Sequence, residues 1–348
     1  MKVIFVIVSM AGGGAERVIS ILANQFVKSG IDVCIMMTAG DEVAYELDER
    51  IQLCSMGGTS GGSLKKRIER IRNMRTVFKR NRNSTIISFG PGTSFFTVVA
   101  DLFLHHHLII SERNDPAACA YPIIRNLIYS RARAVVFQTE AAKNCFPVRI
   151  QKKGVVIANP ISANLPDIRR GKRQKTVVAV GRLETQKNYP LLLDAFSEFH
   201  KQNKDFILHI YGEGSQKGIL QEQAERLHIE NYIVWEGFCR DVLQRIKRAG
   251  IYVLPSDYEG VSNALLEAMA MELAVVATDC PIGGSALCIE DGINGRLVPV
   301  RNVSRMVQAM SELVNDPEKA EKMAKEAGKV RVRFSEEKIA EQWKKLLL

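Results

Sequence analysis

Two glutamates, Glu259 and Glu267, frame the part of this chain whose residue types are best suited to chemistry. Residues 251–254 predict a short buried strand, and a polar turn leads from it into a helix that begins near Ser262. From 264 to 271 every helix position is apolar except Glu267, so we expect the helix to be buried. A carboxylate on a buried helix needs a partner or a ligand, because an unpaired buried charge is costly.

The beginning of this helix is suited to bind an anion. The first backbone N–H groups of a helix have no acceptor within the helix, and with the helix dipole they favour a phosphate group. Glu259 would lie at the mouth of this pocket and Glu267 one to two turns inside. The alternative is that Glu267 pairs with an arginine and that Glu259 is a solvated loop residue. The N–H groups belong to Gly260, Val261, Ser262 and Asn263.

The spacing of the two glutamates resembles the E-x7-E signature of family-four retaining glycosyltransferases, which have the GT-B fold. Glu259 and Glu267 take the two glutamate positions. The resemblance implies that the first glutamate contacts the donor sugar and that the second holds the ribose of the nucleotide. It also implies an α/β protein with two doubly wound, Rossmann-like domains that face each other across a cleft, and retention of the anomeric configuration.

A second loop in the C-terminal half carries two cations that suit a diphosphate. Residues 176–180 predict a strand, and Arg182 and Lys187 follow it before Pro190 opens a helix. Arginine can hold a phosphate through two hydrogen bonds, and lysine acts as a point charge. The two residues match the donor-diphosphate motif of the same family, and the alternative is two exposed cations. Through the resemblance, further donor contacts are assigned to Gly13 and Gly14 in a glycine-rich loop and to Gly212, Glu213 and Phe238 at the base pocket.

Strands and helices alternate along the rest of the chain, which is typical of parallel sheets covered by helices on both faces. We expect an N-terminal domain over residues 1–160 and a nucleotide-sugar domain over 175–334, joined by a linker rich in cations. The resemblance places a final helix, 335–348, back on the first domain. Residues 2–9 are interpreted as the first strand and not as a signal peptide, because a glycine turn and a helix follow at once.

The loop after the strand predicted at 108–110 is expected to face the acceptor. Polar residues at the end of a parallel strand mark the ligand-binding edge of such a sheet. The loop resembles the acceptor loop of bacterial family-four enzymes, many of which have a Glu-His pair there. Here Arg113 replaces the histidine, so no histidine base is available; Arg113 would hold an acceptor phosphate or carboxylate, or pair with Glu112 or Asp115. The acceptor-side candidates are Glu112, Arg113 and Asn114.

The positive charge lies almost entirely in the first half of the chain. Of the formal net charge of +10, residues 1–165 carry +9, which suggests an anionic surface as partner. After a glycine- and serine-rich loop at 57–63, residues 64–82 predict an amphipathic helix with nine Lys or Arg against Glu69. We expect this helix to pack its apolar stripe on the sheet and to meet anionic membrane headgroups or a lipid diphosphate. The alternative is an ordinary solvated helix face.

Several classes of protein are excluded or disfavoured by simple counts. No apolar run is long enough to span a bilayer, and seven cysteines without a C-x-x-C pair indicate a reducing compartment. The adjacent histidines at 105–107 diverge from one another in a helix or a strand, which disfavours a metal site. No Asp-x-Asp pair occurs, and we therefore expect no metal cofactor.

Together with the family resemblance, these features predict a metal-independent glycosyltransferase, and the resemblance implies that it is retaining. It would move a hexose or N-acetylhexosamine from a UDP-sugar to a lipid-linked glycan, in the synthesis of a bacterial O-antigen, capsule or exopolysaccharide. Arg182 and Lys187 would stabilise the leaving diphosphate, and Glu259 would orient the donor sugar. We expect a cytoplasmic protein that is bound peripherally to the inner face of the cell membrane and has no nucleic acid partner.

Two other classes of function remain open at this point. An NAD-dependent oxidoreductase would share the doubly wound domains, but the chain lacks the G-x-G-x-x-G fingerprint that such enzymes carry. A non-enzymatic, basic nucleic-acid-binding protein would explain the charge of the first half. It would leave the diphosphate loop of the nearly neutral second half unexplained.

Overall fold

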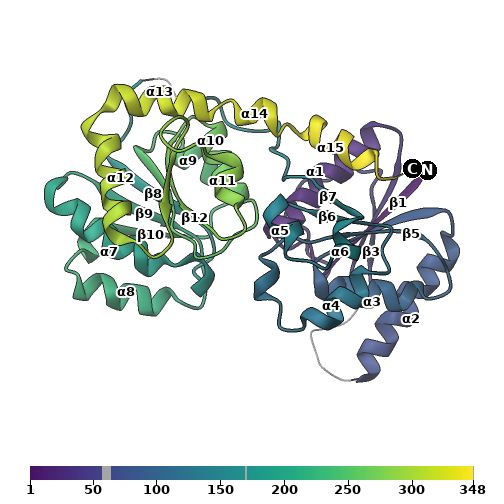
Figure 1. Cartoon of the computed structure of the whole chain (residues 1–348). Coiled ribbons are helices and arrows are strands. Elements are labelled where there is room, and N and C mark those ends of the chain that lie inside the picture. The colour runs from purple at the N-terminus through teal and green to yellow at the C-terminus, as the bar shows by residue number, and fades with distance from the viewer. Residues whose placement is uncertain (57–63, 169–170, 348) are drawn as a thin grey trace. The chain divides into compact units, whose positions relative to one another are not determined.

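The computed structural model describes residues 1–56, 64–168 and 171–347. The chain divides into two compact units, residues 1–160 with 334–348, and residues 161–333 (Figure 1). The loop predicted at 57–63 and the linker cations at 169 and 170 lie outside the described residues. Among the helices that are described, none is both long and apolar enough to cross a membrane.

The first unit is built on a seven-stranded sheet in which every pair of neighbouring strands is parallel. The strand order is β3-β2-β1-β4-β5-β6-β7, so the direction of winding reverses between β1 and β4. The strands are β1 (Lys2–Ile7), β2 (Asp32–Met37), β3 (Gln52–Ser55), β4 (Ser84–Phe89), β5 (His107–Ser111), β6 (Ala134–Phe137) and β7 (Gly154–Val156).

The side chains of each strand alternate between the two faces of this sheet, and helices cover both faces. On one face, Phe5 of β1 stacks on Phe26 of α1 (Gly14–Lys28), and Phe89 of β4 stacks on Trp343 of α15 (Glu336–Lys344). On the other face Ile4 of β1 shares a core with α2 (Leu64–Arg80), α3 (Pro91–Asp101) and α4 (Pro122–Tyr129). The shorter helices are η1 (Pro116–Ala118), α5 (Glu140–Asn144) and α6 (Val148–Gln151).

The second unit holds a six-stranded sheet, again with only parallel neighbours. Its order is β10-β9-β8-β11-β12-β13, and the winding reverses between β8 and β11. In open parallel sheets, ligands bind at the carboxyl ends of the strands beside such a reversal. The strands are β8 (Thr176–Val180), β9 (Ile207–Tyr211), β10 (Ile233–Gly237), β11 (Ile251–Leu254), β12 (Ala274–Asp279) and β13 (Arg296–Pro299).

The helices of the second unit complete the doubly wound arrangement and confirm the predicted α/β class (Figure 1). A core of buried residues joins one face of the sheet to α7, α8 and α12. The elements are η2 (Thr185–Lys187), α7 (Tyr189–Gln202), α8 (Lys217–Arg226), η3 (Glu230–Tyr232), α9 (Val242–Ile246), α10 (Asn263–Ala270), α11 (Gly284–Cys288), α12 (Val303–Asn315), α13 (Pro317–Ala327) and α14 (Val330–Arg333).

The segment predicted as a linker belongs to the second unit from residue 161 onward. Arg173 donates to the backbone oxygen of Glu272 (2.8 Å) and forms an ion pair with Glu321 (3.1 Å). The backbone N–H of Gln174 donates to the oxygen of Arg248 (2.7 Å). These contacts hold Arg173 and Gln174 against the second unit, so this part of the segment belongs to the fold of the unit.

Candidate functional site

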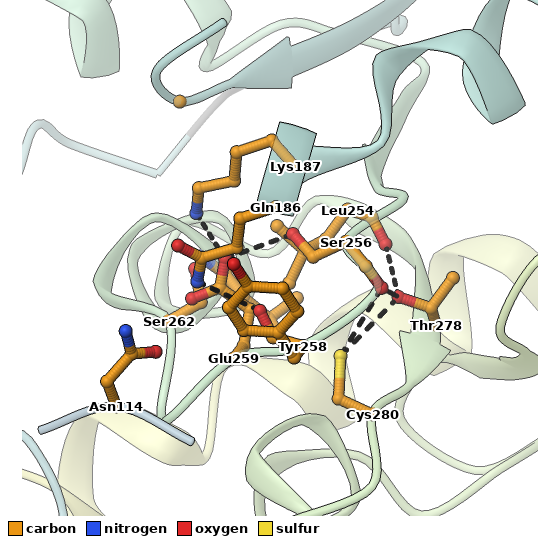
Figure 2. Close-up of polar contacts among 12 residues, drawn as sticks. Asn114, Gln186, Lys187, Leu254, Ser256, Tyr258, Glu259, Ser262, Thr278 and Cys280 are labelled. Atoms are coloured by element: carbon orange, nitrogen blue, oxygen red, sulfur yellow. Dashed lines mark hydrogen bonds and ion pairs between the residues drawn. The ribbon is translucent and has the colours of Figure 1, made fainter. Parts of the chain in front are cut away.

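Two loops lie side by side where the winding of the second sheet reverses. The loop after β8 and the loop after β11 are joined by a hydrogen bond from the N–H of Asp257 to the oxygen of Gln186 (3.0 Å). The Gln186 side chain donates to the oxygen of Tyr258 (2.9 Å), as Figure 2 shows, and Asn188 donates to the carboxylate of Asp257 (2.7 Å). Asn188 has a positive φ of 44°, a conformation that Asn tolerates better than most residues.

The interlocked loops bring Lys187 and Glu259 together as an ion pair (Figure 2). The side chains are only 14% and 11% exposed, and the hydroxyl of Ser256 donates to the same carboxylate oxygen, Oε1, at 3.0 Å. The alternative interpretation of Glu259 as a solvated loop residue is therefore wrong. In such a buried ion pair each partner depends on the other, because removal of either one leaves a buried charge without compensation.

The loop after β11 is supported from below by β12 and by the beginning of α11. The hydroxyl of Thr278 donates to the oxygen of Ser256 (2.5 Å), and the thiol of Cys280 donates to the same oxygen (3.4 Å). Burial raises the pKa of Cys280 to about 12, so the thiol keeps its proton. A Cβ atom at Gly284 would lie 1.8 Å from the oxygen of Gly260, and only glycine permits this approach.

Helix α10 follows the sequence prediction closely. The hydroxyl of Ser262 accepts from the N–H of Leu265 (3.4 Å) as the N-cap, and every residue from Leu265 to Ala270 is buried. Glu267 is among them, with 5% of its surface exposed. The one charged residue of the helix is thus enclosed near the loops that carry Lys187 and Glu259.

Tyr252 of β11 is fully buried and feels the charge of both glutamates. Its only signal in the sequence is an aromatic residue in a buried strand. Burial raises its pKa well above 10, and the negative charges of Glu259 and Glu267 add to this rise. Both carboxylates are therefore close enough to act on one buried phenol. In the described structure the hydroxyl of Tyr252 has no hydrogen-bond partner.

Arg182 lies at the same edge but in a different environment. Its side chain is exposed, and within the described residues it makes no hydrogen bond or ion pair. The alternative of an exposed cation therefore applies to Arg182 and not to Lys187. The backbone around it is fixed by β9: a Cβ at Gly212 would lie 1.9 Å from the oxygen of Gly181, and the N–H of Leu183 donates to the oxygen of Glu213 (2.9 Å).

The remaining donor candidates are divided between the two units. Phe238 follows β10 and is 65% exposed, while the carboxylate of Glu213 pairs with Lys217 (3.3 Å). Gly13 and Gly14 belong to the first unit, where Gly13 is the N-cap of α1 and its oxygen accepts from the hydroxyl of Tyr45 (2.9 Å). One sheet edge therefore brings together Arg182, Lys187, Gly212, Glu213, Phe238, Glu259, Gly260, Val261, Ser262, Asn263 and Glu267.

The acceptor-side candidates lie in the first unit, after β5, and two of them are enclosed. Glu112 is buried; it accepts from the hydroxyl of Tyr129 (2.9 Å) and from the N–H of Arg113 (3.0 Å), and burial raises its pKa. Arg113 donates to Asn159 (2.8 Å) and lies 4.8 Å above the ring of Phe89. Neither ion pair considered for Arg113 forms in the described structure. Asn114 alone is exposed.

One of the three adjacent histidines, His106, has a local role in the fold. His106 is buried; its Nδ1 lies 2.5 Å from the carboxylate of Asp101, and its Nε2 lies 3.2 Å from the oxygen of Asn81. These contacts join the end of α3, the end of α2 and the beginning of β5.

Comparison with known proteins identifies the class of enzyme. The model of the family described as "Glycosyl transferases group 1" matches residues 162–330, which is almost the whole second unit with both interlocked loops. A Haemophilus influenzae protein described as an uncharacterized glycosyltransferase is 28% identical over 343 residues, 97% of each chain. The chain is a glycosyltransferase. The alternatives of an NAD-dependent oxidoreductase and of a non-enzymatic protein are therefore wrong.

Two further comparisons bear on this glycosyltransferase. A Campylobacter jejuni relative is 24% identical and covers 100% of this chain and 98% of its own; its name is GalNAc-alpha-(1->4)-GalNAc-alpha-(1->3)-diNAcBac-PP-undecaprenol alpha-1,4-N-acetyl-D-galactosaminyltransferase. The structure of HepE from Anabaena in complex with UDP and glucose superposes with a TM-score of 0.85 at 18% identity, over 100% of this chain and 99% of HepE. This likeness shows the fold, which is GT-B.

Proposed function

We propose that this glycosyltransferase is a retaining, metal-independent enzyme that uses a UDP-sugar. It transfers a hexose or N-acetylhexosamine to a lipid-linked glycan during the synthesis of a bacterial surface polysaccharide. The observation that carries the proposal is the arrangement at the reversal point of the second sheet. There an exposed cation, Arg182, lies at the same edge as the buried ion pair of Lys187 and Glu259 and the N-terminus of α10.

Arg182 and Lys187 bind the diphosphate of the donor in this proposal. As the bond between the anomeric carbon and the diphosphate breaks, negative charge develops on the leaving oxygen. The two cations and the backbone N–H groups at the start of α10 offset that charge. They supply the compensation that a metal ion provides in other transferases, which is the basis for metal independence.

The ion pair has a defined task when the donor binds. The diphosphate competes with Glu259 for Lys187, and the carboxylate is released toward the sugar, where it orients the hydroxyl groups and faces positive charge at the anomeric carbon. The acceptor oxygen then bonds to the anomeric carbon and its proton leaves. Because Arg113 occupies the place of a histidine base, an oxygen of the departing diphosphate is assigned as the acceptor of that proton.

Glu267 and Phe238 bind the nucleoside in this proposal. A buried carboxylate can accept hydrogen bonds from two neighbouring ribose hydroxyls, and charged acceptors make the stronger hydrogen bonds. The exposed ring of Phe238 offers a flat surface on which uracil can stack. The complex of HepE with UDP supports a uridine nucleotide as the donor.

The name of one relative and the charge of the first unit support the proposed acceptor and location. The name of the Campylobacter relative specifies an acceptor on PP-undecaprenol, a lipid diphosphate. Helix α2 exposes most of a run of lysines and arginines against one glutamate, which suits anionic headgroups and a diphosphate. We place the enzyme peripherally on the inner face of the cytoplasmic membrane, without a nucleic acid partner.

Thermal shifts with UDP, GDP, ADP and NAD, each with and without EDTA, test the donor assignment. A ligand that binds only the folded state raises the melting temperature. We expect a shift with UDP that EDTA does not change and that Arg182→Ala abolishes. Arg226→Ala, an exposed cation at the far end of α8, is the matched control and should retain the shift. A shift with GDP or ADP alone, or one that EDTA removes, would overturn the proposed donor or its metal independence.

A further inference from the structure

Helix α4 of the first unit has its apolar and charged residues on unexpected sides. Its sequence is PIIRNLIY, and an ordinary surface helix would expose the arginine and bury the isoleucines and leucine. The structure does the reverse for most of them: Ile123, Ile124 and Leu127 are 83%, 50% and 55% exposed, whereas Arg125 is buried. Tyr121, just before the helix, is 70% exposed.

Specific contacts hold Arg125 inside and so fix which side of α4 faces outward. Its Nη1 donates to the backbone oxygen of Pro116 (2.6 Å), and its guanidinium lies 4.3 Å from the centre of the Phe146 ring. Tyr129, one turn further on, is fully buried and donates to Glu112 (2.9 Å). Rotating α4 to hide its isoleucines would break these bonds, so the exposed apolar side is a stable feature of the fold.

The exposed side of α4 belongs to a larger surface made by three helices. Met74 of α2, Val98 of α3 and Ile128 of α4 all point into one core on the same face of the seven-stranded sheet. The outer sides of α2, α3 and α4 therefore form one layer, as Figure 1 shows at the lower side of the first unit. On this layer α2 carries eight Lys or Arg between residues 65 and 80 with Glu69 as its one acid.

A second apolar cluster lies at the end of α3 that adjoins α2. Leu102 and Phe103 are 39% and 85% exposed, and Phe103 has a positive φ of 64°. Arg75 of α2 donates to the backbone oxygens of Ala100 (2.9 Å) and Leu102 (2.7 Å). This cation of α2 thus fixes the turn that presents Phe103, and it places exposed apolar side chains directly beside the basic helix.

We propose that this layer is a bilayer-inserting surface, in which Ile123, Ile124 and Leu127 of α4, together with Phe103, enter the boundary between headgroups and acyl chains. The cations of α2 lie over anionic headgroups at the same time. Aliphatic and aromatic side chains beside lysines and arginines are the composition of a helix that lies in a membrane interface. This inference rests on the proposed function, which includes a membrane as partner, and it adds which residues penetrate the bilayer.

Charge favours a bilayer over a second copy of the chain as the occupant of this surface. A symmetric dimer through this layer would place the same patch of each copy against the other. The cations of the two α2 helices would then face one another, which opposes association. An anionic lipid surface instead complements the cations and the exposed side chains together. The buried bond of Arg125 to Pro116 also ties α4 to the loop that contains Asn114, so insertion would hold the acceptor loop at the level of the lipid diphosphate.

Vesicle sedimentation with the full chain tests the proposal. The probes are phosphatidylcholine vesicles with and without phosphatidylglycerol, at low and high NaCl concentration. We expect the wild type to bind the anionic vesicles and to keep part of this binding in high salt, because apolar insertion is not screened. The variant Ile123→Gln/Ile124→Gln/Leu127→Gln should lose the salt-resistant part and bind about tenfold more weakly. Lys65→Glu/Lys66→Glu/Arg67→Glu should lose the salt-sensitive part.

The control variant is Ile219→Gln/Val332→Gln, which removes exposed apolar side chains from the second unit and should bind vesicles like the wild type. Equal binding by the α4 triple variant would overturn the proposal. The proposal would also be overturned if analytical ultracentrifugation showed a dimer for the wild type and a monomer for the triple variant, since a second copy would then cover the surface. Melting temperatures of all variants should show that each remains folded, so that a loss of vesicle binding reports on the surface.

A transfer assay separates this inference from the proposed function. Wild-type enzyme is given a UDP-sugar and a short, water-soluble acceptor without a lipid. Transfer without vesicle binding would refute the inserting surface and leave the proposed reaction intact. Vesicle binding through α4 without transfer from any UDP-sugar would refute the proposed reaction and leave the surface intact.

Discussion

Lys187 and Glu259, which are 72 positions apart in the sequence, form an ion pair at the point where the winding of the second sheet reverses. The two side chains were assigned separate tasks from the sequence, one toward the diphosphate and one toward the sugar. Their pairing means that the charges of these two side chains compensate each other in the described structure. In the proposed function, donor binding exchanges one anionic partner of Lys187 for another, and the cost of uncovering a buried charge is avoided.

Replacing Glu259 by glutamine should separate catalysis from nucleotide binding. The amide keeps the size of the side chain and leaves Lys187 free for the diphosphate, so UDP should bind as tightly as to the wild type or a few-fold more tightly. The turnover number should fall by about 100-fold or more, because the charge that faces the anomeric carbon is lost. Titration calorimetry with UDP and initial-rate measurements check the two parts. Loss of UDP binding in this variant would contradict the exchange mechanism.

Replacing Lys187 by methionine should destabilise the fold as well as abolish activity. It leaves the buried carboxylate of Glu259 without its cation, and such a change typically costs about 3–5 kcal/mol. The double variant Lys187→Met/Glu259→Gln should recover most of that loss in urea unfolding without recovering activity. If the single and double variants were equally stable, the ion pair would not be the cause.

Gly284→Ala should disturb the loop after β11 that carries Glu259, although Gly284 itself lies in α11. The added Cβ would lie 1.8 Å from the oxygen of Gly260, so the loop that carries Glu259 must shift. We expect a loss of about 1–3 kcal/mol in the free energy of unfolding and weaker UDP binding. Gly218→Ala, where a Cβ meets nothing within 4 Å, is the matched control on α8 and should be neutral or slightly stabilising. Unchanged UDP affinity in Gly284→Ala would show that the loop tolerates the shift.

Phe238→Ala tests the nucleoside end of the site. The ring is 65% exposed, so its removal should leave the melting temperature of the free protein nearly unchanged. A base stacked on an aromatic side chain contributes about 1–3 kcal/mol, and UDP should therefore bind roughly tenfold more weakly. Tyr232→Ala, another exposed aromatic of the second unit, serves as the control. Equal losses in both variants would argue against stacking at Phe238.

Because Glu112 is buried, we expect the free energy of unfolding of the first unit to depend on pH. Burial raises the pKa of this carboxyl above that of the unfolded chain, so the folded state binds its proton more tightly. Its contribution to stability is thus full at low pH and falls as the pH rises through the unfolded and then the folded pKa. Glu112→Gln removes this titration and should gain stability relative to the wild type as the pH rises above about 4.3. Urea unfolding across this range checks the sign, and a difference that does not vary with pH would contradict it.

The sequence alone determined the class of fold and predicted which segments lie at one edge of the second sheet. Alternating strands and helices predict parallel sheets because chain connectivity leaves few other arrangements. The burial of α10 around Glu267 followed from a local pattern, since an all-apolar helix has no face suited to water. Arg182 and Lys187 could be placed at a strand end because the turn and the proline of the next helix are local signals.

Only the tertiary structure decided which strands are neighbours. The adjacency of β8 and β11 brings Lys187 to Glu259, and no periodicity in either segment encodes that adjacency. Arg113 is turned inward by Asn159 and Phe89, which lie far from it in the sequence. The orientation of helix α4 has the same cause. Pro116 and Phe146 bind Arg125 on the inner side, and Ile123 therefore faces outward. Local patterns fix which segments become helices and strands, whereas long-range contacts fix which side of each one meets the core.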